Sequence, residues 1–193
     1  MTVRTSEADP LRVDWLPWGG PGGVGLTLAP GRKGPSTSTG GRWDRSLEKD
    51  LDRLVQVHAA THLVALIEDH ELDIYRLGDL FGAAHARGLL VRRLPIPDGG
   101  TPKLGHVVDL CDWIQEATSC GRVVIHCIGG LGRSGTIAGC LLTETGLNPD
   151  EALETLRVVR GPRCPENAQQ RRFISAYATA RNARIATDRD EDC

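Results

Sequence analysis

The sequence is first informative for what it has little of. Aromatic residues make up 4% of the 193 residues, so any core must be built from aliphatic side chains. No apolar run reaches the roughly eighteen residues that a membrane-spanning helix needs. The first ten residues contain no apolar stretch, which argues against a secretory signal. We therefore expect a chain that works in the cytoplasm.

An excess of either charge is also missing. The chain carries 23 Lys and Arg against 25 Asp and Glu, which gives a formal net charge of −2. Such a balance offers no electrostatic basis for binding a nucleic acid or an anionic membrane. Neither is predicted as a partner.

Metal-binding patterns are absent as well. None of the six cysteines forms a C-x-x-C pair, and no pair of histidines has the spacing of a zinc site. No metal and no cofactor is predicted, and without an export signal the thiols are expected to be reduced. Most of the cysteines are expected to be small buried hydrophobic residues. The surroundings of Cys127 do not fit that description.

What is present divides the chain into three parts. Residues 1–45 are rich in Gly, Pro, Ser and Thr, and this segment is expected to be only partly packed on the domain. Residues 46–183 are predicted to form the catalytic domain, and the charged tail 184–193 is predicted to be disordered. The run W-G-G-P-G-G-V-G-L at 18–26 lacks the Lys-Ser/Thr of a nucleotide-binding loop, so turns are predicted there.

Short apolar runs alternate with stretches of helical periodicity. Strands are predicted over 24–28, 62–67, 89–95 and 122–126. Helices are predicted to start at Thr101-Pro102 and Asn148-Pro149 and to cover 133–145 and about 166–183. This alternation indicates an α/β fold, a single domain with a mostly parallel central sheet flanked by helices.

The segment H-C-I-G-G-L-G-R-S-G, residues 126–135, is the most informative part of the chain. It lies where the strand 122–126 meets a helix, so backbone N–H groups and the helix N-terminus can converge on one anion. Its glycines allow a tight curl, and Arg133 offers a planar fork for two phosphate oxygens. Cys127 stands at the base of this loop, where amides and a guanidinium favour the thiolate. The sequence therefore predicts a nucleophilic cysteine in a phosphate-binding loop between a buried strand and a helix.

A thiolate that attacks a phosphate ester needs a proton donor for the leaving oxygen. Asp98, in P-I-P-D-G-G-T-P at 95–102, is our candidate for the general acid, and later for the base that activates water. Gly99 and Gly100 would let that loop move.

The two motifs together resemble the protein-tyrosine and dual-specificity phosphatases, whose signature is H-C-x-x-G-x-x-R-S/T. D-G-G-T-P followed by H-C-I-G-G-L-G-R-S is most similar to their kinase-associated phosphatase, or cyclin-dependent kinase inhibitor 3-like, branch. The resemblance implies a phosphatase that hydrolyses phosphotyrosine in proteins through a cysteinyl-phosphate intermediate, with phosphoserine and phosphothreonine as further candidate substrates. The expected partner is a phosphorylated protein.

The resemblance also implies a role for each matching residue. Cys127 matches the nucleophile, Asp98 the general acid, and Ser134 the hydroxyl that stabilises the departing thiolate. Arg133 matches the arginine that holds the phosphoryl group, and His126 matches the position that orders the loop. The phosphate cradle corresponds to Ile128, Gly129, Gly130, Leu131 and Gly132. Gln170, or Gln169 in an alternative register, matches a glutamine near the hydrolytic water.

Two other functions are compatible with a cysteine in an anion-binding loop. A rhodanese-like sulfurtransferase would have a shorter loop than the six positions from Cys127 to Arg133. A phosphoprotein-binding module without turnover typically lacks the Cys, the Arg or the Asp, and all three are present here. Cys164 is a hypothetical disulfide partner that would protect an oxidised Cys127.

Overall fold

The computed structural model describes residues 2–35 and 41–191, with side chains up to Ala183. The strands are β1 Val3–Arg4, β2 Asp14–Trp15, β3 Gly23–Thr27, β4 Lys33–Pro35, β5 Arg42–Asp44, β6 His62–Ala65, β7 Leu90–Arg93 and β8 Arg122–His126. The helices are α1 Leu47–Gln56, α2 Asp69–Ile74, α3 Leu80–His85, α4 Leu104–Thr118, α5 Gly132–Glu144, α6 Pro149–Arg160 and α7 Ala168–Glu191. Within the described residues, no helix is long and apolar enough to cross a membrane.

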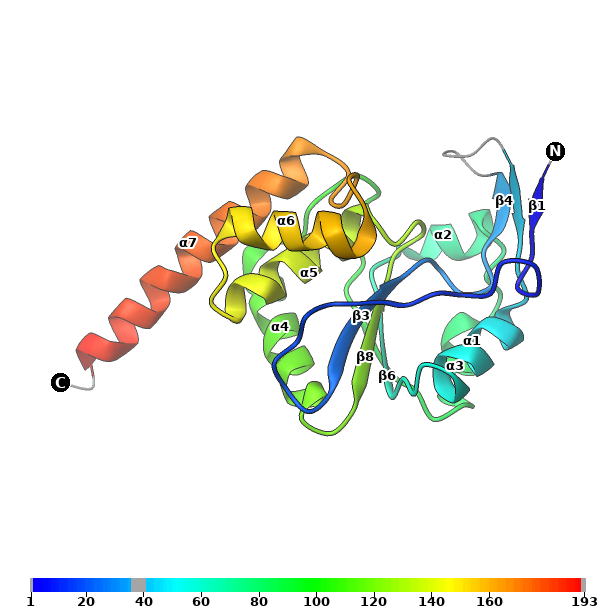
Figure 1. Cartoon of the computed structure of the whole chain (residues 1–193), viewed down its shortest axis with the longest axis horizontal. Helices are drawn as coiled ribbons and strands as arrows, with labels where there is room; N and C mark the ends of the chain where they lie inside the picture. The colour runs from blue at the N-terminus through cyan, green and yellow to red at the C-terminus, as the bar shows by residue number, and fades with distance from the viewer. Residues whose placement is uncertain (1, 36–40, 192–193) are drawn as a thin grey trace.

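The central sheet has five strands in the order β2-β3-β8-β6-β7. All its neighbouring pairs are parallel except β2 with β3. A smaller three-stranded sheet, β1-β5-β4, lies beside it near the N-terminus (Figure 1). The predicted α/β fold with a mostly parallel sheet is confirmed. Strand β8 lies at the centre of the sheet, so the loop that follows it emerges from the middle of the molecule.

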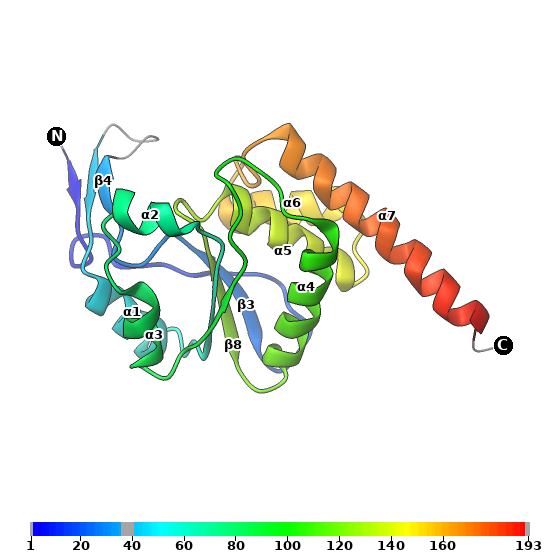
Figure 2. The ribbon, with the colours of Figure 1, turned by 180° about the vertical axis from the view of Figure 1, so that it is seen from behind.

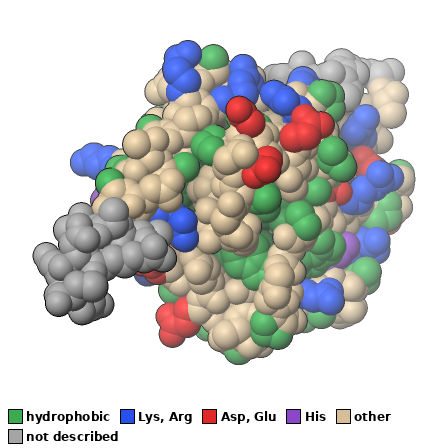
Figure 3. Space-filling view, turned by 60° about the vertical axis from the view of Figure 1, so that its left-hand side comes forward, with side chains coloured by type: hydrophobic (Ala, Val, Ile, Leu, Met, Phe, Trp, Pro, Cys, Tyr) green, Lys and Arg blue, Asp and Glu red, His purple; other side chains and the backbone are tan. Residues whose placement is uncertain are grey.

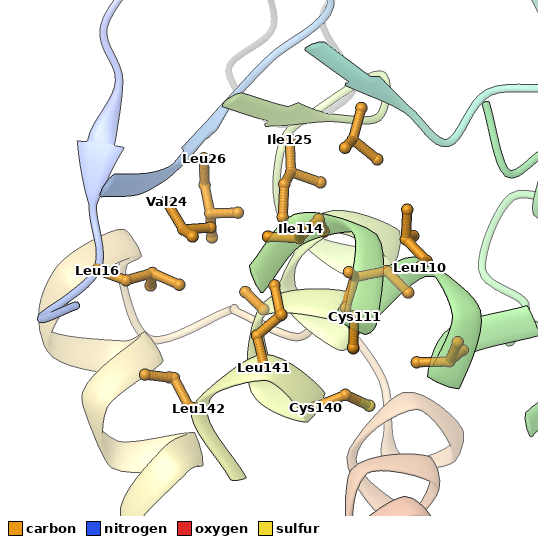
Figure 4. Packing of buried hydrophobic residues seen from close by; sticks show 14 of the residues in the cluster. Leu16, Val24, Leu26, Leu110, Cys111, Ile114, Ile125, Cys140, Leu141 and Leu142 are labelled. Carbon is orange, nitrogen blue, oxygen red and sulfur yellow. The ribbon is translucent and has the colours of Figure 1, made fainter. Parts of the chain in front are cut away.

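Helices cover both faces of the central sheet (Figures 1 and 2). Helices α4, α5, α6 and α7 lie on one face, and α1 and α3 lie on the other. Strand β8 alternates accordingly: Val123 and Ile125 point into the first core and Val124 into the second. In Figure 4, strand and helix side chains meet in the first core, among them Val24, Leu26, Ile114, Ile125 and Leu141. Aliphatic side chains thus form the core that the scarcity of aromatic residues implied.

The N-terminal segment has a larger part in the fold than its composition suggested. It supplies β2 and β3 to the central sheet, and β3 pairs with β8 along its full length, from Gly23 with Arg122 to Thr27 with His126. Leu26 is completely buried. Gly23 and Gly25 lie where the ring of Trp15 packs against the strand, and a Cβ at either position would come within 3.2 Å of that ring. The described residues of this segment, 2–35 and 41–45, therefore supply strands to both sheets.

Helix α6 begins where side chains cap the free backbone N–H groups of its first turn. Asn148 accepts hydrogen bonds from the backbone N–H groups of Asp150 and Glu151 at 3.0 Å, and Glu151 accepts one from the N–H of Asn148 at 2.9 Å. This confirms the predicted start of α6.

Two other helix ends differ from the prediction. Helix α4 starts at Leu104 with Lys103 as the N-cap, because Thr101 and Pro102 continue the preceding loop in non-helical conformation. Proline suits that conformation as well as a first helical turn. Helix α7 extends to Glu191 and does not end near residue 183, since 184–191 contain neither glycine nor proline to stop it. The backbone is helical over 184–191, and residues 192–193 lie outside the described chain. The disorder expected for the tail stays a prediction.

Candidate active site

The loop between β8 and α5, residues 127–133, is called here the cysteine loop. Cys127 is only 3% exposed, and its Sγ accepts a hydrogen bond from the backbone N–H of Gly130 at 3.2 Å. The Oγ of Ser134, in the first turn of α5, lies 3.5 Å from the same sulfur. Because the loop leads into a helix N-terminus, the peptide dipoles of α5 also favour a negative charge here. The structure thus brings Cys127 and Ser134 together at a position suited to an anion.

The guanidinium of Arg133 contacts three other residues of the site. Its two terminal nitrogens donate to both oxygens of Glu71, at 2.6 and 2.8 Å, and Nη1 also donates to the carbonyl of Ile96 at 3.0 Å. Nη2 lies 3.0 Å from Oδ1 of Asp98. Burial opposes both charges of the Arg133–Glu71 pair, but their hydrogen bonds outweigh it. They raise the pKa of Arg133 and lower the pKa of Glu71.

Glu71 was not predicted from the sequence. It belongs to the short helix α2, where its Oε2 also accepts a hydrogen bond from the N–H of Glu68 at 2.8 Å. The only available signal was the general rule that a buried arginine requires a carboxylate. That rule does not select one of 25 acidic residues in the chain.

Asp98 lies in the segment 95–102, called here the Asp98 loop. Its side chain is 76% exposed, in contrast to the 1% of Arg133 with which it pairs. The loop is tethered from the start of α7: the side chain of Asn167 donates to the carbonyl of Gly99 at 2.9 Å. Gln170 Nε2 donates to the carbonyl of Gly100 at 3.4 Å. The exposed carboxylate is thus placed next to the guanidinium by a few loop contacts.

The two glutamines of the sequence prediction are in different environments. Gln170 is completely buried, and its Oε1 accepts a hydrogen bond from the N–H of Glu166 at 3.1 Å while its amide nitrogen contacts the Asp98 loop. Gln169 is exposed on α7. Gln170 therefore occupies the active-site side of the helix, where its amide ties two segments together.

His126 is fully buried at the end of β8. Its Nδ1 lies 3.1 Å from the carbonyl oxygen of Cys127, so Nδ1 carries the proton of that hydrogen bond. Burial lowers the pKa of His126 to about 4, and the charge of Arg133 acts in the same direction. The ring is neutral at pH 7 and fixes the backbone of the nucleophile candidate.

Two glycines of the cysteine loop are required by close approach. Gly130 has φ +68°, and a Cβ there would lie 2.4 Å from the carbonyl oxygen of Thr27 in β3. A Cβ on Gly132 would lie 2.4 Å from the carboxylate of Glu166 and 2.9 Å from the amide of Gln170. Strand β3 and the residues at the start of α7 therefore contact the loop closely, and leave no room for a side chain at Gly130 or Gly132.

Arg160, at the end of α6, is a second residue that the sequence did not identify. Its Nε donates to the carbonyl of Gly130 at 2.7 Å and its Nη2 to the carbonyl of Gly129 at 3.2 Å. It also forms an ion pair with Asp14 of β2. In a trans peptide the N–H points opposite to the carbonyl, so the amides of Gly130 and Leu131 face away from Arg160. The amide of Gly130 accordingly donates to Cys127 Sγ.

Comparison with known proteins identifies the family of the chain. The family model for cyclin-dependent kinase inhibitor 3 matches residues 5–153. The chain belongs to this family. The rat cyclin-dependent kinase inhibitor 3 is 29% identical over 180 residues, which cover 89% of this chain and 80% of the relative.

Solved structures of other phosphatases share the fold. The crystal structure of kinase associated phosphatase, with its catalytic cysteine replaced by serine, has a TM-score of 0.79 at 25% identity. The match covers 89% of this chain and 96% of that protein. The active form of Tk-PTP has a TM-score of 0.64 at 28% identity, and the match covers 81% of this chain and 91% of that protein. The predicted membership of the cysteine-based phosphatases is therefore confirmed.

Cys164 packs directly behind the cysteine loop of this family member. Its Sγ donates to the carbonyl of Leu131 at 3.3 Å, and a Cβ on Gly135 would lie 2.5 Å from it. Burial raises the pKa of Cys164 to about 12, so the group is a neutral thiol at pH 7. Its suggested disulfide with Cys127 stays a prediction. Among the described residues, no cluster of three or more His, Cys, Asp or Glu side chains could hold a metal ion.

Proposed function

We propose that this chain is a protein phosphatase that hydrolyses phosphate esters of protein side chains, with Cys127 as the nucleophile. The arrangement of Cys127 Sγ, 3.2 Å from the Gly130 amide and 3.5 Å from the Ser134 hydroxyl, carries the proposal. A positive charge from Arg133, held by Glu71, completes the site. Hydrogen-bond donors and a positive charge stabilise both the negative thiolate and the negative oxygens of a bound phosphoryl group.

In the first step the Cys127 thiolate attacks phosphorus. An S–P bond forms, the P–O bond to the substrate oxygen breaks, and Asp98 gives its proton to that leaving oxygen. The guanidinium of Arg133 binds two of the phosphoryl oxygens. Asp98 is paired with Arg133 as a carboxylate before substrate arrives. The entering phosphate takes over this contact, and Asp98 takes up a proton from solvent, so the acid lies beside the scissile oxygen.

In the second step water attacks the cysteinyl phosphate. Asp98 takes a proton from the water, an O–P bond forms, and the S–P bond breaks to release inorganic phosphate and the thiolate. The hydroxyl of Ser134 lies close enough to the sulfur to donate a hydrogen bond to the departing thiolate. Neither step requires a metal.

The substrate class is a phosphorylated protein. Relatives bear the names cyclin-dependent kinase inhibitor 3 and kinase associated phosphatase, and we infer that a phosphorylated protein partner is the substrate here too. The absence of an aromatic-rich phosphotyrosine-recognition loop favours activity on phosphothreonine and phosphoserine as well as phosphotyrosine. A reactive thiolate requires reducing surroundings, which fits the expected cytoplasmic location.

The decisive experiment compares turnover of para-nitrophenyl phosphate and of matched phosphotyrosine and phosphothreonine peptides. Cys127→Ser is expected to reduce turnover below detection, whereas Cys120→Ser, at an exposed cysteine, is expected to have no effect. Activity should survive a chelator. Full turnover by Cys127→Ser would refute the nucleophile.

The same experiment separates the proposal from its alternatives. A native protein that binds the phosphopeptides but never releases phosphate would be a binding module. High thiosulfate sulfurtransferase activity without phosphate release would instead indicate a rhodanese-like enzyme.

A further inference from the structure

Three arginine side chains are buried in the N-terminal half of the molecule and around the cysteine loop. Arg45 donates from Nε and Nη2 to both oxygens of Asp50, at 2.7 and 2.8 Å, and Arg133 donates from Nη1 and Nη2 to both oxygens of Glu71. Arg32 is only 7% exposed, yet it takes part in none of the ion pairs found among the described residues. Its buried Nε has no hydrogen-bond partner there.

The guanidinium of Arg32 lies close to two aromatic rings. Its Cζ is 5.5 Å from the ring centroid of Trp43 and 5.4 Å from that of Tyr75. Its Nη1 donates to the carbonyl oxygen of Ile128 at 3.3 Å, and the backbone N–H of Ala29 donates to the same oxygen at 3.2 Å. Ile128 is the residue that follows Cys127, so Arg32 contacts the cysteine loop beside the sulfur.

The backbone that carries Arg32 is fixed. Lys33 N–H donates to the carbonyl of Tyr75 at 2.9 Å, and Gly31 N–H donates to the buried carboxylate of Asp50 at 2.9 Å. The carbonyl of Arg32 accepts a hydrogen bond from the N–H of Arg45 at 3.2 Å. The side chain is therefore presented to the loop from a rigid anchor.

The charged surroundings of Arg32 include the groups proposed for catalysis. Burial lowers its pKa, and this is opposed by the groups that act on it electrostatically: Tyr75, Cys127, Asp98 and Glu166. Cys127, Asp98 and Glu166 line or adjoin the cysteine loop. Arg32 thus stands within electrostatic range of the proposed nucleophile and of the proposed acid.

We propose that Arg32 is a positioning residue of the active site, which holds the Ile128 carbonyl and places a second fixed positive charge beside the Cys127 thiolate and the bound phosphoryl group. This inference rests on the proposed function. It gives the N-terminal segment a direct part in the chemistry. It also accounts for an otherwise unfavourable feature, since a buried charge without a carboxylate partner destabilises a fold. The thiolate and the phosphate dianion are the partners that compensate it.

Removal of Arg32 should have a different effect from removal of an arginine that only stabilises the fold. Removing a partnered arginine such as Arg45 would orphan a buried carboxylate and destabilise the fold. Arg32→Met keeps an apolar stem of similar length against the two rings and leaves no carboxylate unpaired, so its melting temperature is expected to stay within a few degrees of the native value. The reactivity of Cys127 should change instead.

The test uses the full chain with Arg32→Met, Arg32→Lys and, as a matched loss of one neighbouring positive charge, Lys33→Met. Lys33 pairs with Asp44 at the surface. The rate of Cys127 alkylation by iodoacetamide is measured against pH, together with inhibition by inorganic phosphate and kcat/KM for a phosphopeptide. For Arg32→Met we expect the alkylation profile to move to higher pH and kcat/KM and phosphate affinity to fall about ten- to a hundredfold.

Arg32→Lys separates the two parts of the inference. It keeps the charge, so the alkylation profile should stay near that of the native protein, while loss of the Ile128 contact should lower kcat several-fold. Lys33→Met should match the native protein throughout. If Arg32→Met does not fold, Arg32→Lys decides, because native kcat in that variant would refute the positioning role.

Two outcomes distinguish this inference from the proposed function. An active native protein whose Arg32→Met variant has the native alkylation profile and phosphate inhibition would overturn the role of Arg32. A native protein that releases no phosphate from any substrate would refute the phosphatase. The alkylation and phosphate-binding measurements would still decide whether Arg32 acts on Cys127.

Discussion

The cysteine loop and the Asp98 loop meet at the guanidinium of Arg133, but the first is buried and the second is exposed at its key side chain. The cysteine loop is buried, and its contacts come from β3, α2, α6 and the residues that precede α7. The Asp98 loop is exposed at its key side chain, and side-chain hydrogen bonds from Asn167 and Gln170 hold its backbone. One loop is preorganised, and the other is attached by contacts that can open.

This difference matches the chemistry proposed for each loop. Groups that stabilise developing charge act best when they are fixed before the reaction, because then no reorganisation is needed. A general acid must instead approach the substrate oxygen and later a water molecule, which requires access to solvent. Fixed positive charge around Cys127 and an exposed carboxylate at Asp98 are the arrangement that these two tasks require.

The largest effect is expected from a change at Glu71 that loosens the buried cysteine loop. Glu71→Gln removes the carboxylate that both terminal nitrogens of Arg133 contact. Breaking a buried pair from one side leaves an uncompensated charge, so we expect a loss of about 3–5 kcal/mol of unfolding free energy. Phosphopeptide turnover should fall at least about a hundredfold, since Arg133 loses its orientation.

Asp69→Asn, from the same helix, is the control for this variant. Asp69 forms an exposed ion pair with Arg93, for which a loss below about 1 kcal/mol is expected. Urea unfolding measures both variants. Equal stability losses in the two would show that the Arg133–Glu71 pair has no special weight.

The burial of His126 beside the cysteine loop should make the stability of the protein depend on pH. Burial lowers the pKa of His126 to about 4, whereas an unfolded chain has the ordinary histidine value near 6.5. The neutral ring therefore contributes stability that is fully present above about pH 6.5 and is lost as the pH falls toward 4. The loss amounts to about 3 kcal/mol.

Unfolding free energies measured between pH 7 and pH 4 check this prediction. His126→Asn should reduce the slope of stability against pH in this window, and asparagine keeps a donor for the Cys127 carbonyl. His106→Asn, at an exposed position of α4, is the matched control. A slope that His126→Asn leaves unchanged would contradict the assignment.

The smallest expected effect on stability comes from a change in the exposed Asp98 loop. Asp98→Asn should leave stability almost unchanged, because its side chain is largely solvated. Turnover of a phosphotyrosine peptide should fall about a hundredfold, whereas para-nitrophenyl phosphate, whose leaving group needs no proton, should lose much less. Asp109→Asn on the exposed side of α4 serves as control. Equal losses with both substrates would remove Asp98 from the role of acid.

The sequence predicted those parts of the site that are continuous in the chain. Cys127, Arg133 and Ser134 occur within one strand-turn-helix, where a spacing of a few residues determines their geometry. The start of α6 at Asn148 was predictable for the same reason, because its cap involves only the next three residues.

The residues that the sequence did not reveal reach the loop from a distance. Glu71, Arg32 and Arg160 contact the cysteine loop or Arg133 through side chains that are ordinary surface types by composition. Only the pairing of β3 with β8 and the packing of α2 and α6 bring them there. Periodicity identifies which face of an element is buried, but it does not say which distant charge that face will meet.

The parallel pairing of β3 with β8 also has a consequence for the way the protein is made. Gly23 leaves the ribosome long before Arg122, its partner in the sheet. At typical synthesis rates the first strand waits on the order of ten seconds for its neighbour. During that time its apolar residues and unpaired backbone are open to other nascent chains. We expect yield in cells to depend on chaperone supply more strongly than the stability of the finished protein would suggest.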